Sequence, residues 1–64
     1  MKGATMTKTQ AKRALATYHL TFGSDHYRVV DTLAAALFAR SATKDEAAWD
    51  AAWDAAEDML SRWG

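Results

Sequence analysis

Alanine dominates this sequence and proline is absent: fifteen of the 64 residues are alanine, and none is proline. Alanine has the highest intrinsic helix propensity, whereas proline breaks a helix because it lacks a backbone N–H and its ring collides with the preceding turn. A chain of this composition can place almost every residue in a helix. The sequence therefore predicts an all-α fold.

The short length and the absence of cysteine limit how this fold is stabilised. A chain of about 60 residues buries only about 60% of the surface that it exposes when unfolded. Because no cysteine is present, disulfides and thiolate zinc sites are excluded as sources of stability. The lack of cysteine is typical of a reducing compartment, so we expect a cytoplasmic protein. No apolar run approaches the roughly 18 residues that span a bilayer, so we expect no membrane contact.

Three segments carry apolar residues at helical spacing, which predicts a compact bundle of three helices. The predicted helices run over about 9–22, 25–41 and 44–62. Residues 1–7 lack this periodicity and are expected to form a flexible N-terminal tail, so that residues 8–64 make up a single helical domain. The middle helix has the widest apolar arc, which indicates that it packs against both of the others. The core residues expected in the first two helices are Ala11, Leu15, Tyr18, Phe22, Val29, Val30, Leu33 and Leu37.

Capping residues set the predicted boundaries between these helices. Gly23 can adopt the left-handed backbone conformation that ends a helix, and Ser24 is then expected to cap the next one. Thr43 and Glu46 have the spacing of a capping box, in which each side chain accepts a hydrogen bond from the other residue's backbone. This pair predicts that the third helix begins at Lys44.

An alternative structure is a β-hairpin over 17–30 followed by helices. Tyr18, Leu20 and Phe22 alternate as in a strand, and the segment 26–30 is rich in residues that favour strands. An isolated two-stranded hairpin is only marginally stable in water, however, so the bundle of three helices is preferred.

The third predicted helix contains the only internal repeat, in which Ala-Ala-Trp-Asp occurs at 47–50 and again at 51–54. Because an α-helix turns by about 100° per residue, residues spaced by three or four gather on one face. The tryptophans on the predicted face are Trp49, Trp53 and Trp63, and the acidic strip along its border consists of Asp50, Asp54 and Asp58.

The position of these tryptophans has two interpretations. Each indole buries on the order of 150–250 Å², so three of them carry more apolar area than a chain this short can easily cover. They either pack against the first two helices as core, or form a homodimer seam or a docking surface for another protein. Both interpretations can hold for different rings.

The acidic strip likewise has more than one interpretation, because the charges divide along the chain. Residues 1–42 contain six Lys or Arg and two Asp, whereas residues 43–64 contain two Lys or Arg and six Asp or Glu. The acidic strip is a face exposed to solvent, or forms ion pairs with Lys8, Lys12 and Arg13 of the first helix, or faces a basic partner.

No arrangement of residues indicates catalysis or a cofactor. The only histidines, His19 and His26, have no third metal ligand at a suitable spacing, no nucleophile stands beside a base, and no glycine-rich phosphate loop is present. We therefore expect no enzymatic activity, no metal and no cofactor.

A non-enzymatic protein–protein interaction module is the function that we expect. Its partner-binding residues would be the three tryptophans as anchors, with the aspartates of the acidic strip as a selective rim. Small size and the lack of catalytic chemistry suggest an accessory or inhibitor protein of a phage or mobile element that docks on a host protein. The competing hypothesis is a small nucleic-acid-binding regulator that uses Lys8, Lys12 and Arg13.

Overall fold

The computed structural model describes residues 6–64 and contains three helices: α1 (Lys8–Phe22), α2 (His26–Arg40) and α3 (Glu46–Trp63). The predicted all-α bundle of three helices is confirmed. No strand occurs among the described residues, so the alternative hairpin over 17–30 is wrong. Leu20 shows the reason: it is 89% exposed, because on a helix it points away from the buried stripe that contains Leu15.

The N-cap of α1, Thr7, is the last residue of the stretch 1–7 predicted as a flexible tail, of which residues 1–5 lie outside the described residues. Thr7 Oγ1 accepts a hydrogen bond from the backbone N–H of Gln10 at 3.1 Å, and Gln10 Oε1 accepts one from the N–H of Thr7 at 3.1 Å. This reciprocal pair is a capping box, which satisfies two backbone donors at the start of α1. Met6, just before it, packs against the hydrophobic core.

Aspartate caps the other two helices, and the predicted caps Ser24 and Thr43 are wrong. Oδ1 of Asp25 accepts a hydrogen bond from the backbone N–H three residues later at 3.2 Å, and Oδ1 of Asp45 does the same at 2.9 Å. A carboxylate also interacts favourably with the positive end of the helix dipole, an advantage that a hydroxyl lacks. As a result, α2 and α3 begin one and two residues after their predicted starts.

Gly23 ends α1, as predicted. Its φ of 63° is the one positive φ within residues 6–64, and its N–H donates to the carbonyl of His19 at 2.8 Å. With a ψ of −128° the backbone lies outside the left-handed helical conformation that was predicted, in another region of positive φ that costs glycine little because it has no Cβ. This conformation allows the chain to reverse within three residues, between Phe22 and His26.

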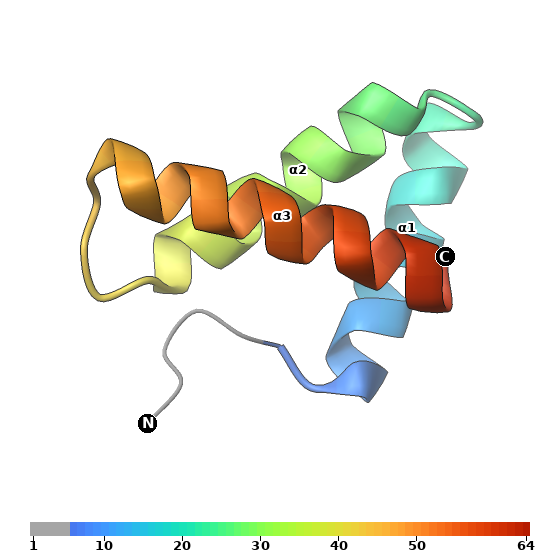
Figure 1. The fold of residues 1–64 in the computed structure, drawn as a ribbon. Coiled ribbons are helices and arrows are strands. Elements are labelled where there is room, and N and C mark those ends of the chain that lie inside the picture. Colours follow the sequence, from blue (N-terminus) through green and yellow to red (C-terminus); the bar gives the residue numbers. More distant parts are fainter. Residues whose placement is uncertain (1–5) are drawn as a thin grey trace.

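The three helices pack so that each contacts the other two. Figure 1 shows α2 and α3 running in roughly opposite directions and crossing at an angle, while α1 lies at the end of this pair where α2 begins and α3 ends. The contact between α2 and α3 is the most extensive of the three. None of these helices within residues 6–64 is both long enough and apolar enough to cross a membrane.

Residues from all three helices form one hydrophobic core. The buried residues are Ala11 and Leu15 of α1, Val29, Val30, Leu33, Ala34 and Leu37 of α2, and Ala52, Ala56 and Met59 of α3. The middle helix supplies half of them, which confirms that it packs against both neighbours. Small alanines at 52 and 56 let α2 approach α3 closely, so the larger side chains at the edge of this contact are pushed toward the surface.

Candidate protein-interaction groove

A groove of about 600 Å³ runs along the surface between α2 and α3. Its lining residues are Tyr27 and Asp31 from α2 and Trp49, Asp50, Trp53 and Asp54 from α3. We call it the α2/α3 groove. The residues come in three pairs spaced by four, and side chains at this spacing lie on one face of a helix. The helical repeat of the sequence therefore places aromatic rings and carboxylates side by side.

Aromatic rings from the two helices meet across this interface. The ring centroids of Tyr27 and Trp53 lie 5.4 Å apart at an interplanar angle of 53°, and those of Phe38 and Trp49 lie 5.5 Å apart at 87°. Both geometries are favourable for aromatic pairs. Trp49 and Trp53 are half-buried and pack against the core, whereas Tyr27 is 67% exposed. The groove thus has two rings held against the core and one ring exposed to solvent.

Three carboxylates border these rings without a cationic partner. Asp31 is half-buried, and Asp50 and Asp54 are exposed. The ion pairs found within residues 6–64 involve two other aspartates: Asp25 with Arg28 at 3.8 Å and Asp58 with Arg62 at 2.9 Å. The groove therefore carries negative charge that the described part of the chain does not neutralise.

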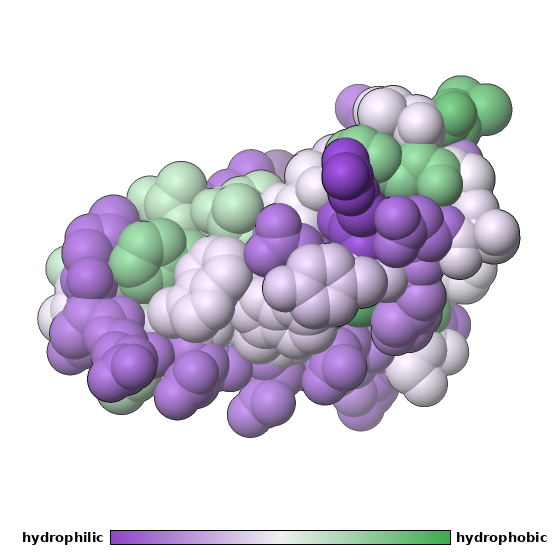
Figure 2. Space-filling view, turned by 90° about the horizontal axis from the view of Figure 1, so that it is seen from above, coloured by the Kyte–Doolittle hydropathy of each residue, from purple (hydrophilic) through white to green (hydrophobic). Residues whose placement is uncertain are grey.

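The predicted ion pairs between the acidic strip and Lys8, Lys12 and Arg13 of α1 do not form among the described residues. The reason is the arrangement of the helices: α3 turns its apolar side toward the other two, so its strip faces away from α1. Figure 2 shows a face of the molecule on which pale side chains of intermediate hydropathy lie beside a border of purple hydrophilic ones.

Lys44 lies next to the aromatic rings of the α2/α3 interface, where it contacts the ring of Phe38. Lys44 Nζ lies 5.7 Å from the centroid of the Phe38 ring, and Phe38 in turn packs edge-on against Trp49. The ammonium also donates hydrogen bonds to the carbonyls of Ser41 at 2.6 Å and Ala39 at 3.3 Å. A cation over an aromatic ring is thus already part of this interface.

Two of the predicted partner-binding residues lie outside the groove. Trp63 is half-buried against the core at the end of α3, and does not line the groove. Asp58 is paired with Arg62 one turn away. The structure therefore brings together Trp49, Trp53, Asp50 and Asp54, and adds Tyr27 and Asp31, which sequence reasoning did not assign to the site.

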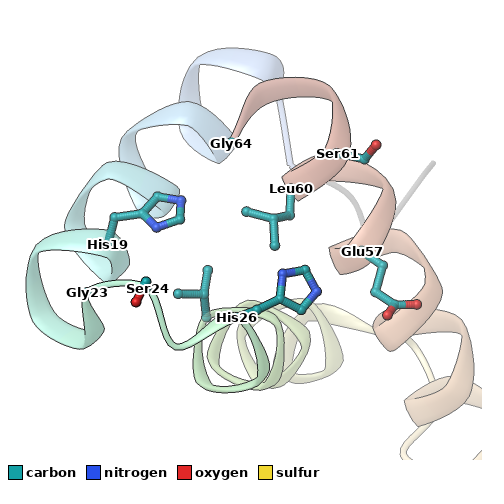
Figure 3. Close-up of a pocket in the computed structure, with 9 residues that line it drawn as sticks. His19, Gly23, Ser24, His26, Glu57, Leu60, Ser61 and Gly64 are labelled. Carbon is teal, nitrogen blue, oxygen red and sulfur yellow. The ribbon is translucent and has the colours of Figure 1, made fainter.

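A second cavity of about 400 Å³ lies where the ends of the three helices meet. In Figure 3 the rings of His19 and His26 enter it from α1 and α2, with Leu60 between them, while the side chains of Glu57 and Ser61 point away. Nε2 of His19 is buried and has no hydrogen-bond partner among the described residues. Within that part of the chain no three side chains of His, Cys, Asp or Glu are grouped as metal ligands, and the polar residues that line this cavity include both histidines.

The basic residues proposed for nucleic-acid binding are only partly gathered. Lys8, Lys12 and Arg13 are exposed on α1. Arg13 lines a hollow of about 330 Å³ between α1 and α2, which we call the α1/α2 hollow, together with Arg40 and Tyr18. The two lysines do not line it.

Comparison with known proteins adds no assignment to these surfaces. Within residues 6–64 the α2/α3 groove combines aromatic rings with carboxylates that form no ion pair there. Function is therefore inferred from its geometry. Searches of protein-family models, of curated protein sequences and of solved structures find no match to this chain.

Proposed function

We propose that this protein is a non-enzymatic protein-interaction module and that its α2/α3 groove binds a positively charged segment of a protein partner. One observation carries the proposal: the carboxylates of Asp31, Asp50 and Asp54 surround exposed aromatic surface and find no cation within residues 6–64. Aromatic anchors with a charged rim are the arrangement from which protein interfaces draw most of their affinity and selectivity.

The energetics favour a cationic occupant over a neutral one. Like charges spaced by four on a helix, such as Asp50 and Asp54, destabilise it by roughly 0.2–0.5 kcal/mol per pair, and a bound cation removes that repulsion. The half-buried carboxylate of Asp31 is less screened by solvent than the other two, so its attraction for a positive charge is stronger.

The size of the groove indicates what kind of partner fits. Standard protein interfaces bury about 800 Å² on each side, far more than two turns of each of two short helices present. A single extended or helical segment of the partner is the occupant that matches this area. Negative charge at the rim would attract a basic segment at a distance and speed its association.

A peptide selection tests the proposal. Random peptides displayed on phage are selected on the wild-type protein and counter-selected on the variant Asp31→Asn/Asp50→Asn/Asp54→Asn, which keeps the shape of each side chain. We expect the recovered peptides to be rich in Lys and Arg, and to shift the indole N–H resonances of Trp49 and Trp53. Recovery of apolar or acidic peptides, or of peptides that bind both proteins equally, would contradict it.

A further inference from the structure

We infer that the side chain selected by the α2/α3 groove is arginine, in preference to lysine. This inference rests on the proposed function and names the chemistry of the occupant: a guanidinium on a basic segment of a protein partner. It follows from the flat rings and the carboxylates that line the groove together, and from the contrast with the site of Lys44.

The aromatic walls suit a planar cation. Tyr27 and Trp53 meet at 53° with their centroids 5.4 Å apart, and the 67% exposure of Tyr27 leaves ring surface uncovered on the α2 side. A guanidinium stacks flat on such a surface while its N–H groups stay in its own plane, free to donate sideways. An ammonium has no flat face and holds its hydration shell more strongly, so it gains less from these walls.

The carboxylates that line the groove come from both helices. Asp31 belongs to α2, whereas Asp50 and Asp54 belong to α3, one turn and roughly 6 Å apart. A guanidinium has five donors in a rigid fork and can reach carboxylates in different directions at once, often with two hydrogen bonds to one of them. The separated carboxylates therefore match a forked donor better than a point charge.

Lys44 shows what an ammonium receives in the same molecule. Its Nζ lies over the Phe38 ring and donates to two carbonyls that converge at the end of α2, those of Ala39 and Ser41. The groove presents carboxylates spread along two helices instead of converging carbonyls. The chain thus contains one cation site built for an ammonium, and the neighbouring groove differs from it in the features that favour arginine.

Three matched peptides test the inference. Each has the same Gly-Ser backbone and the same three variable positions, which hold arginine, lysine or citrulline, the last being a neutral analogue of arginine. Binding is followed on the full chain by the indole N–H resonances of Trp49 and Trp53, with Trp63 as the internal control outside the groove. We expect the arginine peptide to bind about threefold to tenfold more tightly than the lysine peptide, the citrulline peptide not to bind, and Trp63 not to shift.

Two variants separate the contributions of the ring and of the charge. Tyr27→Leu removes an exposed ring without opening the core, so we expect it to bring the arginine-to-lysine ratio close to one. Asp54→Asn should weaken both peptides severalfold, whereas Asp58→Asn, on the same helix but outside the groove, should weaken neither.

The outcomes distinguish the inference from the proposed function. Equal or tighter binding of the lysine peptide by the wild-type chain overturns arginine selectivity and leaves a general cation groove. An unchanged ratio in Tyr27→Leu overturns the stacking geometry. If neither charged peptide shifts Trp49 or Trp53 in the folded protein, the proposed function fails together with the inference.

Discussion

The two sides of α2 carry opposite chemistry. On the side of α3 the groove combines tryptophan and tyrosine rings with three carboxylates, whereas on the side of α1 the hollow is lined by Arg13, Arg40 and Tyr18. Both surfaces rest on the same buried row of α2, which includes Val30 and Leu33. A net charge of zero therefore conceals two surfaces of opposite sign, and the pairing of helices decides where each of them forms.

The contrast also shows why charge along the sequence differs from charge in space. The basic first half and the acidic second half of the chain look complementary, yet α3 contacts α1 mainly at its C-terminal end, and no ion pair joins the two helices among the described residues. Each charged set remains available to an external partner.

The largest expected effect comes from the core that both surfaces share. Leu33 is fully buried, and Leu33→Ala should lower the free energy of unfolding by about 2–5 kcal/mol, which includes the cavity that it leaves. Urea titration followed by circular dichroism measures it, with Ala35→Ser at an exposed position of the same helix as the control. If Leu33→Ala disrupted only the α2/α3 groove or only the α1/α2 hollow, the two surfaces would not share one core.

The next effect concerns the charges themselves. Asp31→Asn/Asp50→Asn/Asp54→Asn should reduce the affinity for a basic peptide by about tenfold or more, equivalent to about 1.4 kcal/mol, and the wild-type affinity should fall as salt rises. The control is Arg13→Gln/Arg40→Gln, which removes two charges, instead of three, on the other side of α2 and should leave binding to the groove intact. Calorimetry at two salt concentrations measures both. A gain of affinity in Arg13→Gln/Arg40→Gln comparable to the loss in the aspartate variant would show that net charge alone attracts the peptide.

A smaller effect is expected from the helix caps. Asp45→Ala and Thr7→Ala each remove a side-chain acceptor from a helix start, at a cost of about 0.5–2 kcal/mol. Asp45→Ala should also weaken peptide binding, because Trp49 lies near the start of α3. Thr7→Ala should loosen the start of α1, which lies beside the α1/α2 hollow, and should leave peptide binding unchanged. Hydrogen exchange of the two helix starts, compared with peptide titration, tests this difference. Ser24→Ala is the control for a side chain that was predicted to cap but does not; Thr43 is unsuitable, because its hydroxyl donates to the capping Oδ1 of Asp45 at 3.5 Å.

The smallest effect is expected for the exposed ion pair on α3. Asp58 and Arg62 are 2.9 Å apart, but both side chains are more than half exposed, so Asp58→Asn should change stability by less than about 0.5 kcal/mol. Thermal unfolding measures it. A larger loss would mean that this pair, and not the capped start of the helix, holds α3 in place.

The fold was predictable from local chemistry, whereas the groove was predictable only in part. Apolar spacing gave the helices to within two residues at their starts, and Gly23 marked the turn, because both signals act within a few residues. The predicted N-caps of α2 and α3 were wrong because serine, threonine and aspartate can all cap a helix, and the sequence does not show which of these side chains accepts from the backbone N–H. Trp49, Trp53 and their aspartates share one helix, so their proximity followed from the helical period.

Tyr27 and Asp31 were missed for a different reason. Their contact with α3 depends on how α2 slides and rotates against it, which no spacing within one helix specifies. A clue was present in the sequence, since Tyr27 and Asp31 are four residues apart and therefore lie on one face of a helix. The clue was ambiguous, because an aromatic residue beside a wide apolar arc is equally typical of the core.

The placement of the three indoles gives the molecule an optical consequence. Two of them, Trp49 and Trp53, line the groove, and the third, Trp63, lies apart at the end of α3. Emission from the first pair would respond to an occupant that displaces water from the rings, while emission from the third would not. Binding of an occupant would therefore change the fluorescence emission of Trp49 and Trp53 but not that of Trp63, so binding could be followed without an attached dye.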